Sequence, residues 1–422
     1  MTHKKIVIVG GGPAGLAAAA GAAEYGETDI LLLEREKETG GILNQCIHNG
    51  FGLHTFGEEL TGPEYAARFS ARVRALDIET RTETTVLSVT RNKIVTAVNP
   101  ADGLFSVKAD AVVLACGCRE RPRGAVNIAG ARCAGIYSAG TAQKLVNIDG
   151  YLPGREVVVL GSGDIGLIMA RRLTCEGARV KAVAEIMPYS SGLNRNIVQC
   201  LDDFDIPLLL SHTVVRIEGR ERVTGVVLAR VDENRQPVRG TERYISCDTL
   251  LLSVGLIPEN ELLSQAGVGL DPVTGGAIVD DSLMTDADGI FQCGNALHVH
   301  DLVDFVSEEG LRAGESAAAF VAGRLEAYDR KNACEIEAGF GVRYVVPRFV
   351  ARGNEKTVQL KLRVNGVFKD ARLVVEADGK RIFSKARRVV TPGEMETVAL
   401  DQAASASLRQ FARVKVFLEI LR

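Results

Sequence analysis

The stretch from residue 1 to residue 40 constrains the fold of this chain more than any other. Residues 5–9 are apolar and mostly β-branched, which predicts a buried parallel strand. Gly-Gly-Gly-Pro-Ala-Gly follows at 10–15, and the alanine-rich residues 16–23 predict a helix. A second strand at 28–33 ends on the acid Glu34. This order of strand, glycine turn, helix, strand and acid predicts a βαβ unit that binds a dinucleotide.

Each part of this first fingerprint has a physical role towards a bound pyrophosphate. Gly10 permits the tight turn, Gly12 leaves room where a Cβ atom would meet the phosphates, and Gly15 lets the helix pack close to the strand. The helix N-terminus adds unpaired N–H groups and a partial positive charge. Glu34 is placed to accept hydrogen bonds from a ribose diol. The predicted binding residues of this turn are Gly10, Gly12, Pro13, Ala14, Gly15, Glu34 and Arg35.

A second complete fingerprint begins at residue 156. A strand at 156–160 leads into Gly-Ser-Gly-Asp-Ile-Gly at 161–166, a helix and a strand follow over 167–184, and the acid is Glu185. Two fingerprints predict two dinucleotides, or one domain inserted in another. An acid at this ribose accepts from a 2′-hydroxyl and repels a 2′-phosphate, so we expect NADH rather than NADPH, although Arg195 leaves a phosphate site open. The predicted binding residues are Gly161, Gly163, Asp164, Ile165, Gly166 and Glu185.

Each fingerprint is followed by its own closing strand. The segments 110–122 and 248–260 both start with an acid, continue as a buried apolar strand, reach a glycine and leave through a proline. Ala115, Gly117 and Gly255 are the predicted cofactor contacts at these two strand ends. The other predicted elements are a helix at 62–75, an antiparallel insert at 85–90, 94–98 and 104–108, strands at 214–217, 223–230 and 243–245, a strand within 285–295, and a helix from about 307 to 325.

Composition excludes several classes of function. A chain of 422 residues suggests about two or three domains, and its net charge of −3 gives no sign of a nucleic acid or an anionic membrane as partner. The nine cysteines form no Cys-x-x-Cys pair, which argues against a metal site and suits a reducing compartment. Lys4 and Lys5 before an apolar run imitate a signal peptide, but a βαβ unit explains the glycines and a signal peptide does not. With no run of about 18 apolar residues, we expect a cytoplasmic protein without a membrane segment.

Together these motifs resemble the two-dinucleotide-binding flavoproteins of the pyridine nucleotide–disulfide oxidoreductase superfamily. The resemblance covers roughly residues 1–327 and rests on five motifs in the family's order. It implies that the first fingerprint binds FAD, that the second binds NAD(P)H, and that the NAD domain is inserted in the FAD domain. The segment 115–117 looks like the family's Ala-Thr-Gly segment, and Gly294-Asn295 looks like its Gly-Asp segment. Asn295 keeps an acceptor for the flavin's ribityl chain but loses the usual charge, so we expect FAD to stay bound.

A finer resemblance points to a subgroup. The stretches 40–50, 135–143 and 294–304 resemble the bacterial NAD(P)/FAD-dependent oxidoreductases often encoded beside an FAD-dependent glycerol-3-phosphate dehydrogenase. Opine-oxidase and sarcosine-oxidase α-type subunits look like more distant relatives. Such proteins work beside another flavoprotein or redox subunit, which implies a partner of that kind and leaves homo- and hetero-oligomers open. The paired cysteines of the disulfide reductases are missing here, although Cys46 alone could cycle through a sulfenate or a mixed disulfide.

The resemblance places the loop after Glu34 along the cofactor, towards the flavin ring. Gly40-Gly41 would allow a close approach of the backbone, and Cys46 and His48 follow near the expected ring. One interpretation is a redox-active or proton-transferring group beside the flavin; the other is a glycine-rich loop with a buried thiol and two surface histidines, His48 and His54. Gly41 is added to the predicted FAD contacts.

The segment after Asn295 is the second place where side chains could reach a flavin. The resemblance implies that the following helix points its positive end at the pyrimidine side of the ring. His298, His300, Asp301 and Asp304 are candidates for that neighbourhood; the alternative makes them helix-entry residues, with Asp304 or Ser307 as N-cap. The predicted catalytic residues of the whole chain are Cys46, His48, His300 and Asp304.

The last ninety or so residues change character. Alternating apolar and charged residues predict strands, with turns at Asn365-Gly366, Asp378-Gly379 and Pro392-Gly393 between some of them. They predict a small antiparallel β-sandwich that serves either as a packing or dimerisation module or as a docking surface. The predicted strands are 343–351, 357–364, 371–376, 381–385, 389–391 and 413–421. The predicted domains are 1–122 and 266–330 for FAD, 123–265 for NAD(H), and 335–422 for the β-sandwich.

The fold class expected is therefore α/β, with two Rossmann-like domains and an all-β domain at the C-terminus. The function expected is an FAD-dependent NAD(P)H oxidoreductase that passes a hydride between NAD(H) and the flavin and exchanges electrons with a partner redox protein. Two alternatives stay open: a subunit that oxidises a small amine or hydroxy acid, and a flavin-bound structural subunit without turnover.

Overall fold

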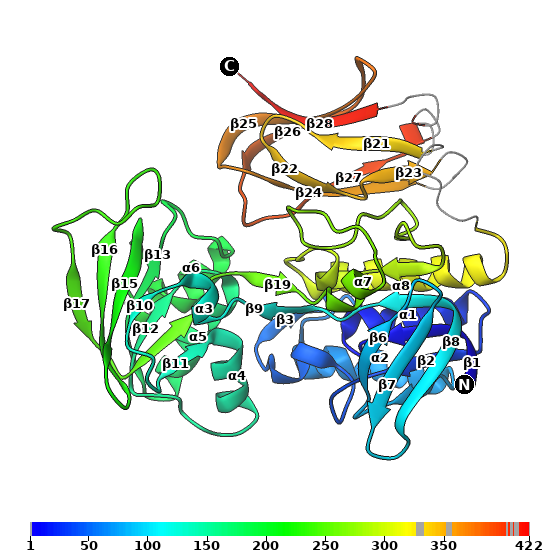
Figure 1. Cartoon of the computed structure of the whole chain (residues 1–422). Helices are drawn as coiled ribbons and strands as arrows, with labels where there is room; N and C mark the ends of the chain where they lie inside the picture. The colour runs from blue at the N-terminus through cyan, green and yellow to red at the C-terminus, as the bar shows by residue number, and fades with distance from the viewer. Residues whose placement is uncertain are drawn as a thin grey trace. The chain divides into compact units, whose positions relative to one another are not determined.

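The computed structural model describes residues 2–325, 333–351, 357–401, 404–405, 408 and 413–421. The chain forms two compact units, of which one consists of Met1–Cys118 and Pro258–Arg422 and the other of Arg119–Ile257 (Figure 1). The second unit is thus an insertion in the sequence of the first. The C-terminal β domain belongs to the first unit but keeps a hydrophobic core of its own.

A mixed seven-stranded sheet forms the centre of the first unit. Four parallel strands, β5, β2, β1 and β8, carry the first fingerprint, and β20 joins β8 in parallel. The predicted insert is confirmed as the antiparallel strands β6 and β7 beside β8. The strands are β1 (Thr2–Val9), β2 (Ile30–Leu33), β5 (Glu79–Arg81), β6 (Thr85–Val89), β7 (Ile94–Asn99), β8 (Gly103–Leu114) and β20 (Ile290–Gln292).

Strand β8 differs from the prediction of two separate strands at 104–108 and 110–114. It runs without a break because β1 pairs with it across the predicted gap, from Val107 to Leu114 opposite Thr2 to Val9. On its other side, β8 exchanges β7 for β20 as partner. The insert is therefore an extension of the central sheet, and it moves no element of the fingerprint.

Two helices pack almost backbone to backbone on this sheet. Helix α1 (Pro13–Glu24) and helix α8 (Val303–Val321) meet through glycines. A Cβ atom on Gly310 would lie 2.3 Å from the carbonyl oxygen of Ala14, and one on Gly314 would lie 1.9 Å from that of Ala18. Because no side chain fits there, the backbones of the two helices are in direct contact, and α8 packs against the start of α1.

The remaining elements of this part are short apart from α2 (Gly62–Ala75), whose bounds match the prediction. Thr61 and Glu64 form a capping box at its start. The others are η1 (Gly41–Gln45), β3 (Asn49–Phe51), β4 (Leu60–Thr61), α7 (Glu261–Gln265) and η3 (Gly294–Ala296). Helix α8 begins earlier than the predicted residue 307, with Leu302 as N-cap and no side-chain cap, so the predicted caps Asp304 and Ser307 are wrong.

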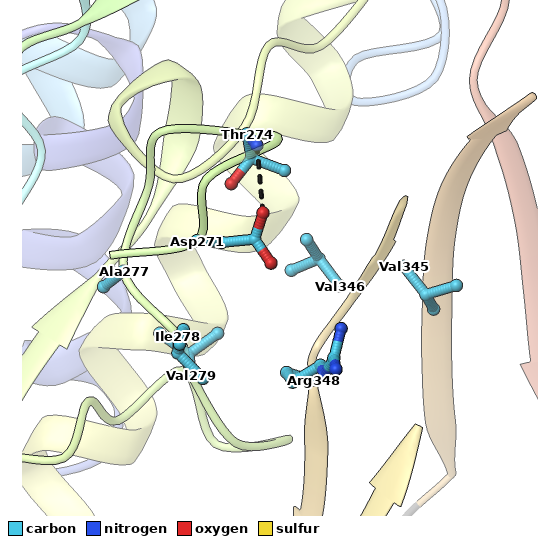
Figure 2. A pocket seen from close by; sticks show the side chains of 8 residues that line it. All are labelled: Asp271, Thr274, Ala277, Ile278, Val279, Val345, Val346 and Arg348. Atoms are coloured by element: carbon cyan, nitrogen blue, oxygen red, sulfur yellow. Dashed lines mark hydrogen bonds between the residues drawn. The ribbon is translucent and has the colours of Figure 1, made fainter. Parts of the chain in front are cut away.

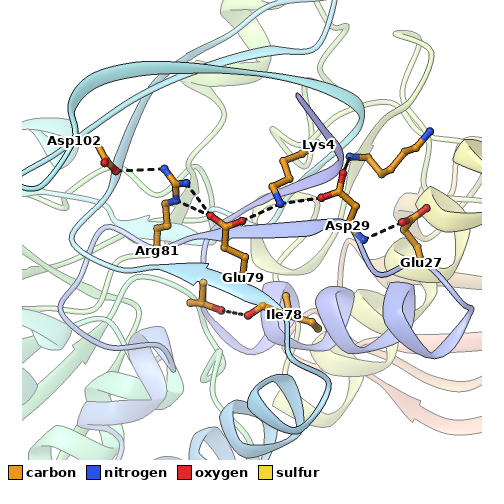
Figure 3. Close-up of polar contacts among 9 residues, drawn as sticks. Lys4, Glu27, Asp29, Ile78, Glu79, Arg81 and Asp102 are labelled. Carbon is orange, nitrogen blue, oxygen red and sulfur yellow. Dashed lines mark hydrogen bonds and ion pairs between the residues drawn. The ribbon is translucent and has the colours of Figure 1, made fainter. Parts of the chain in front are cut away.

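A chain of ion pairs runs across β1, β2 and β5 (Figure 3). Lys4 contacts Asp29 at 2.8 Å and Glu79 at 2.9 Å, and Arg81 contacts Glu79 at 2.8 Å and Asp102 at 3.3 Å. These side chains are partly exposed, so each pair adds at most about 1 kcal/mol. They connect β1, the residue before β2, and β5 through their side chains.

The inserted unit repeats the parallel pattern of the first. Its five-stranded parallel sheet has the order β11-β18-β12-β13-β14, and a four-stranded sheet, β10-β15-β16-β17, accompanies it. The strands are β9 (Cys118–Glu120), β10 (Ala129–Gly130), β11 (Ile136–Ser138), β12 (Glu156–Leu160), β13 (Arg179–Glu185), β14 (Leu208–Leu210), β15 (His212–Gly219), β16 (Val223–Arg230), β17 (Arg243–Ser246), β18 (Thr249–Leu252) and β19 (Leu256–Pro258). The helices are α3 (Arg123–Val126), α4 (Ala139–Asn147), α5 (Asp164–Cys175), α6 (Asn194–Cys200) and η2 (Asp202–Phe204).

The C-terminal domain stacks two sheets, of order β23-β21-β28-β25-β26 and β22-β24-β27 (Figure 1). It is not purely antiparallel as predicted, because β21 and β28 run parallel. The predicted strand 343–351 is two strands in different sheets, separated at Pro347, which has no N–H to donate. The predicted strands 381–385 and 389–391 are one, and β21 and β27 are additional. The strands are β21 (Ala333–Ala338), β22 (Val342–Val346), β23 (Phe349–Ala351), β24 (Val358–Val364), β25 (Phe368–Ala377), β26 (Lys380–Val390), β27 (Glu396–Leu400) and β28 (Arg413–Ile420).

Candidate functional site

The three glycines of the first turn are required for different reasons. Gly10 has a φ of +103°, and its Cβ would lie 2.4 Å from the carbonyl oxygen of Ala115. A Cβ on Gly15 would lie 1.7 Å from the carbonyl oxygen of Gly10. By contrast, the missing Cβ of Gly12 would face open space, with only the Cα atom of Gly41 within 4.0 Å. The protein itself needs the first two glycines, whereas the third leaves a cradle that a ligand can enter.

Glu34 at the end of β2 is buried and held by the backbone. Its Oε2 accepts from the N–H of Gly11 at 2.6 Å, and its Oε1 accepts from the N–H of Glu36 at 2.8 Å. Each carboxylate oxygen keeps a further lone pair, so the group can also receive two hydroxyls of a ribose. The neighbouring Arg35 is exposed.

The second turn has the same construction. Gly161 has a φ of +95° and its Cβ would lie 2.0 Å from the carbonyl oxygen of Ser253, and the Cβ of Gly166 would lie 2.7 Å from the Cβ of the same serine. A Cβ on Gly163 would lie 3.2 Å from the Oγ of Ser253, and its nearest backbone neighbour, the carbonyl oxygen of Ser253, would be 3.8 Å away. Asp164 opens α5 but accepts from the N–H of Leu193 at 2.8 Å, so it also fixes the loop that follows β13. Ile165 is the next residue of α5.

Glu185 matches Glu34 in burial and in bonding. Its Oε2 accepts from the N–H of Ser162 at 2.9 Å and from the Ser162 hydroxyl at 2.7 Å, and its Oε1 accepts from the N–H of Met187 at 2.9 Å. Ser162 is fully buried. The repetition of turn and acid in both units indicates two nucleotide sites of one kind.

The loop after Glu34 passes directly over the first turn. The N–H of Gly40 donates to the carbonyl of Gly11 at 2.8 Å, and Gly41 has a φ of +58°. Further along, burial raises the pKa of the Cys46 thiol to about 12, and its Sγ lies 3.3 Å from the carbonyl oxygen of Ile42. The thiol is therefore neutral near pH 7. Its predicted redox role stays a prediction, as does that of the half-buried His48, whose ring packs against Phe51.

The predicted site residues of the second FAD segment mainly hold loops. Asn295 accepts from the N–H of His300 at 3.0 Å through its Oδ1. Gly294 has a φ of +69°, and a Cβ there would lie 2.7 Å from that of Ala14 at the start of α1. The closing-strand glycines Gly117 and Gly255 also have positive φ and face open space.

Asp304 is placed on the first turn of α8 and is buried. Its carboxylate accepts from the N–H of Gly52 at 3.2 Å and from that of Thr55 at 2.8 Å. It therefore joins the loop that carries His48 to the helix that follows Gly294-Asn295. A direct role in chemistry stays a prediction.

A buried carboxylate that the sequence did not single out, Glu309, organises this region. Its Oε2 accepts from the N–H of Gly294 at 2.8 Å. Three nitrogen atoms surround its Oε1: His298 Nε2 at 2.9 Å, His300 Nε2 at 3.4 Å and Lys361 Nζ at 3.5 Å. These four side chains, of Glu309, His298, His300 and Lys361, are called the Glu309 cluster below. Burial alone would raise the pKa of Glu309, but His300, Lys361 and His298 hold that pKa well below its usual range.

The donor atoms of His298, His300 and Glu309 lie within 4.8 Å of one another, and such sets bind zinc and related metals in proteins. Lys361 argues against this use, because a divalent ion would add two positive charges beside an ammonium already 3.5 Å from the same oxygen. The cluster is better described as one carboxylate shared by three bases. The absence of a metal stays a prediction.

Comparison with known proteins identifies the family. The model of the pyridine nucleotide-disulphide oxidoreductases matches residues 4–313. This chain belongs to the pyridine nucleotide-disulphide oxidoreductase family. Members of the family are FAD-dependent oxidoreductases that bind FAD and NAD(P). The observed fold, two Rossmann-like domains with a β-rich C-terminal region, is that of the family with one addition.

Relatives within this family have diverse names. Hydrogen cyanide synthase subunit HcnB of Pseudomonas protegens is 25% identical, over 76% of this chain and 69% of its own length. An opine oxidase subunit from Agrobacterium tumefaciens is 28% identical, over 63% of this chain and 55% of its own length. The crystal structure of T. acidophilum thioredoxin reductase covers 76% of this chain and 99% of its own, with a TM-score of 0.63 and 24% identity, which shows a shared fold.

Two further features of this family member concern membrane-spanning helices and cavities. No helix in the described ranges combines the length and apolar content needed to cross a bilayer. A cavity of about 10 Å³ lies between the loop at 271–279 and the end of β22, with Asp271, Val346 and Arg348 in its wall (Figure 2). It has room for about one water molecule, so it is not a substrate site.

The Glu309 cluster predicts a pH dependence of stability. Burial lowers the pKa of His300 to about 4 from a usual 6.5. The unfolded chain therefore protonates this side chain as the pH falls through 6.5, whereas the folded chain protonates it only near pH 4. The contribution of this difference to the free energy of unfolding is fully present above pH 6.5 and is lost as the pH falls. We expect the parent to lose about 2 kcal/mol between pH 7 and pH 5 in urea titrations. His300→Asn should flatten this slope, whereas the exposed His54→Asn should leave it; equal slopes in parent and His300→Asn would contradict the assignment.

Proposed function

We propose that this oxidoreductase passes a hydride between NAD(H) and FAD and exchanges the electrons with a second carrier. The observation that carries the proposal is the repeated architecture of the two turns. In each, a Cβ atom on the glycine at the helix start, Gly12 or Gly163, would not clash with the protein backbone, so the backbone itself does not require glycine there. In each, a buried acid, Glu34 or Glu185, is fixed by backbone N–H groups at the end of the next strand.

The residues of the first turn fit FAD. The N-cap of helix α1 is Gly12, which supplies no side-chain cap, so the N–H groups and positive end of the helix are available to a pyrophosphate. Gly41 and Gly294 lie against the start of α1 and allow the backbone to come close to the ligand. When both nucleotides are bound, the flavin ring exchanges a hydride with the nicotinamide. The start of α8, which also has no side-chain cap, would stabilise negative charge at the ring.

The second carrier that we propose is a partner redox subunit. Two of the relatives are named as subunits, of hydrogen cyanide synthase and of an opine oxidase. The sequence resemblance to proteins encoded beside FAD-dependent glycerol-3-phosphate dehydrogenases makes such a dehydrogenase the first partner to test. A second candidate function is direct oxidation of a small amine or hydroxy acid, which the opine oxidase relative favours.

Anaerobic reduction of the bound flavin tests the proposed function. We expect the purified protein to show a flavin spectrum that NADH bleaches within seconds to minutes, because hydride transfer needs only the two stacked rings. Bleaching by an opine or a hydroxy acid but not by NADH would support the second candidate. If neither NADH nor the organic substrate reduces the flavin, the protein would have a purely structural role, and the proposal would be contradicted.

The same experiment separates thiol chemistry from hydride transfer. Cys46→Ser should still be bleached by NADH, since the Cys46 thiol is neutral and buried. Its transfer to the second acceptor should change if the thiol takes part there. His48→Ala should shift the pH profile if the imidazole moves a proton. Loss of bleaching in Cys46→Ser with FAD still bound would point to a thiol-dependent reductase instead.

A further inference from the structure

Strand β24 of the C-terminal domain has two opposite faces. Leu360 and Leu362 are fully buried in the core of the β domain. Gln359, Lys361 and Arg363 alternate with them and so point to the other side of the sheet. On a free domain this second face would be a solvated polar face.

In the structure that polar face contacts the segment 299–309 instead. Gln359 Nε2 donates to Glu308 at 3.0 Å, at the exposed rim. Lys361 Nζ lies 3.5 Å from Glu309 and 3.4 Å from the carbonyl oxygen of Phe305.

Arg363 makes the third contact of this face. Its guanidinium donates to the carboxylate of Asp301 and, at 3.1 Å, to the carbonyl of Val299. The N–H of Met395, also in the β domain, donates to the second oxygen of Asp301 at 2.6 Å. Three side chains at alternate positions of β24 therefore contact one continuous stretch of the chain, the segment 299–309.

These contacts are buried rather than superficial. The side chains of Lys361 and Glu309 are 7% and 4% exposed, and those of Arg363 and Asp301 are 12% and 15% exposed. A buried charge that loses its partner is strongly destabilising, because it keeps the cost of leaving water without the compensating attraction. The buried carboxylates of the segment 299–309, Asp301 and Glu309, thus depend on cations of the β domain as their partners.

The same segment fixes the loop that contains Gly294-Asn295. Glu309 accepts from the N–H of Gly294, and Asn295 accepts from the N–H of His300. Lys361 is therefore connected to Gly294 through the carboxylate of Glu309. Arg363 is connected to it through Asp301 and the short loop that His300 and Asn295 hold.

We propose that Lys361 and Arg363 are positioning residues through which the C-terminal β domain holds the 294–300 loop in the shape that FAD binding requires. The β domain is then a structural part of the flavin site, rather than a separate packing or docking module. This inference rests on the proposed binding of FAD at the first turn.

The test compares FAD binding in variants of the full chain. Lys361→Met and Arg363→Met keep the length of the side chain and remove its charge. In each, we expect the Kd of the apoprotein for FAD, from quenching of flavin fluorescence, to rise at least about tenfold, or about 1.4 kcal/mol. The visible circular dichroism of the flavin that still binds should change, because the loop around it has moved. Lys361→Arg should restore a Kd within about threefold of the parent, since it restores the charge.

Arg387→Met is the matched control. Arg387 pairs with Glu396 inside the β domain at 2.6 Å, and the two side chains are 23% and 15% exposed. It should lower the thermal midpoint of the apoprotein as the other variants do, but leave the Kd for FAD and the dichroism unchanged. If Lys361→Met does not fold, Arg363→Lys, which keeps the charge but loses the guanidinium that donates to both Asp301 and the carbonyl of Val299, decides by the same two measurements.

An unchanged Kd for FAD in the Lys361 and Arg363 variants, or an equal rise of this Kd in Arg387→Met, would overturn the inference. The proposed function would remain intact as long as the parent binds FAD. A parent that does not bind FAD would overturn both.

Discussion

Gly12→Val should yield folded protein that carries no flavin. The backbone of Gly12 has a φ of −74°, which any residue adopts, and its Cβ would have no protein atom nearer than 4.0 Å. The substitution therefore places its methyl groups where the pyrophosphate of FAD would lie, at little cost to the apoprotein. We expect colourless protein with a parent-like circular dichroism spectrum, and a Kd for FAD raised by at least about 100-fold.

Two matched glycine variants distinguish this effect from a general loss of structure. Gly15→Ala should destabilise the protein itself, because the new Cβ would lie 1.7 Å from the carbonyl oxygen of Gly10. Gly163→Val should keep the flavin and lose its reduction by NADH, because it changes the other turn. A yellow, folded Gly12→Val protein with one flavin per chain would refute the assignment of FAD to the first turn.

The parts of the fold that could be predicted are those whose sequence pattern has a single physical explanation. Glycines at 10, 12 and 15 between an apolar strand and an alanine-rich helix fit hardly any structure other than a nucleotide-binding βαβ unit. The bounds of α2 were predictable for a similar reason, since Thr61, Pro63 and Glu64 specify a helix start locally. Where local signals were absent, boundaries moved: α8 starts after Leu302, which caps nothing.

The polar centre of the candidate site could not be predicted, because its partners meet only in three dimensions. The sequence Val-Gln-Leu-Lys-Leu-Arg-Val at 358–364 has the alternation of a strand with one solvated face. Nothing in it shows that Lys361 is covered by α8 and lies 3.5 Å from Glu309. Glu309 itself looks like an ordinary helix-surface acid beside Glu308. The sequence left open whether the Cys46 thiol is buried or redox-active, and the burial seen in the structure keeps this thiol neutral near pH 7.

Glu185 should make the protein prefer NADH over NADPH. Its carboxylate cannot turn away from a bound ribose without leaving the N–H groups of Ser162 and Met187 and the Ser162 hydroxyl unpaired in a buried place. A 2′-hydroxyl can donate to this fixed acceptor, whereas a 2′-phosphate would bring two like charges together without water between them. We therefore expect the preference to depend on the backbone N–H groups around Glu185 as well as on its charge.

Anaerobic flavin reduction by each nucleotide measures this preference. We expect kcat/KM for NADH to exceed that for NADPH by about 100-fold, or about 2.7 kcal/mol, in the parent. Glu185→Gln should bring the ratio down by at least about tenfold, because the amide keeps the size and loses the repulsion. Glu176→Gln, which removes an exposed charge on the same unit, should leave the ratio unchanged. A higher kcat/KM for NADPH in the parent would show that a cation such as Arg195, rather than Glu185, selects the nucleotide.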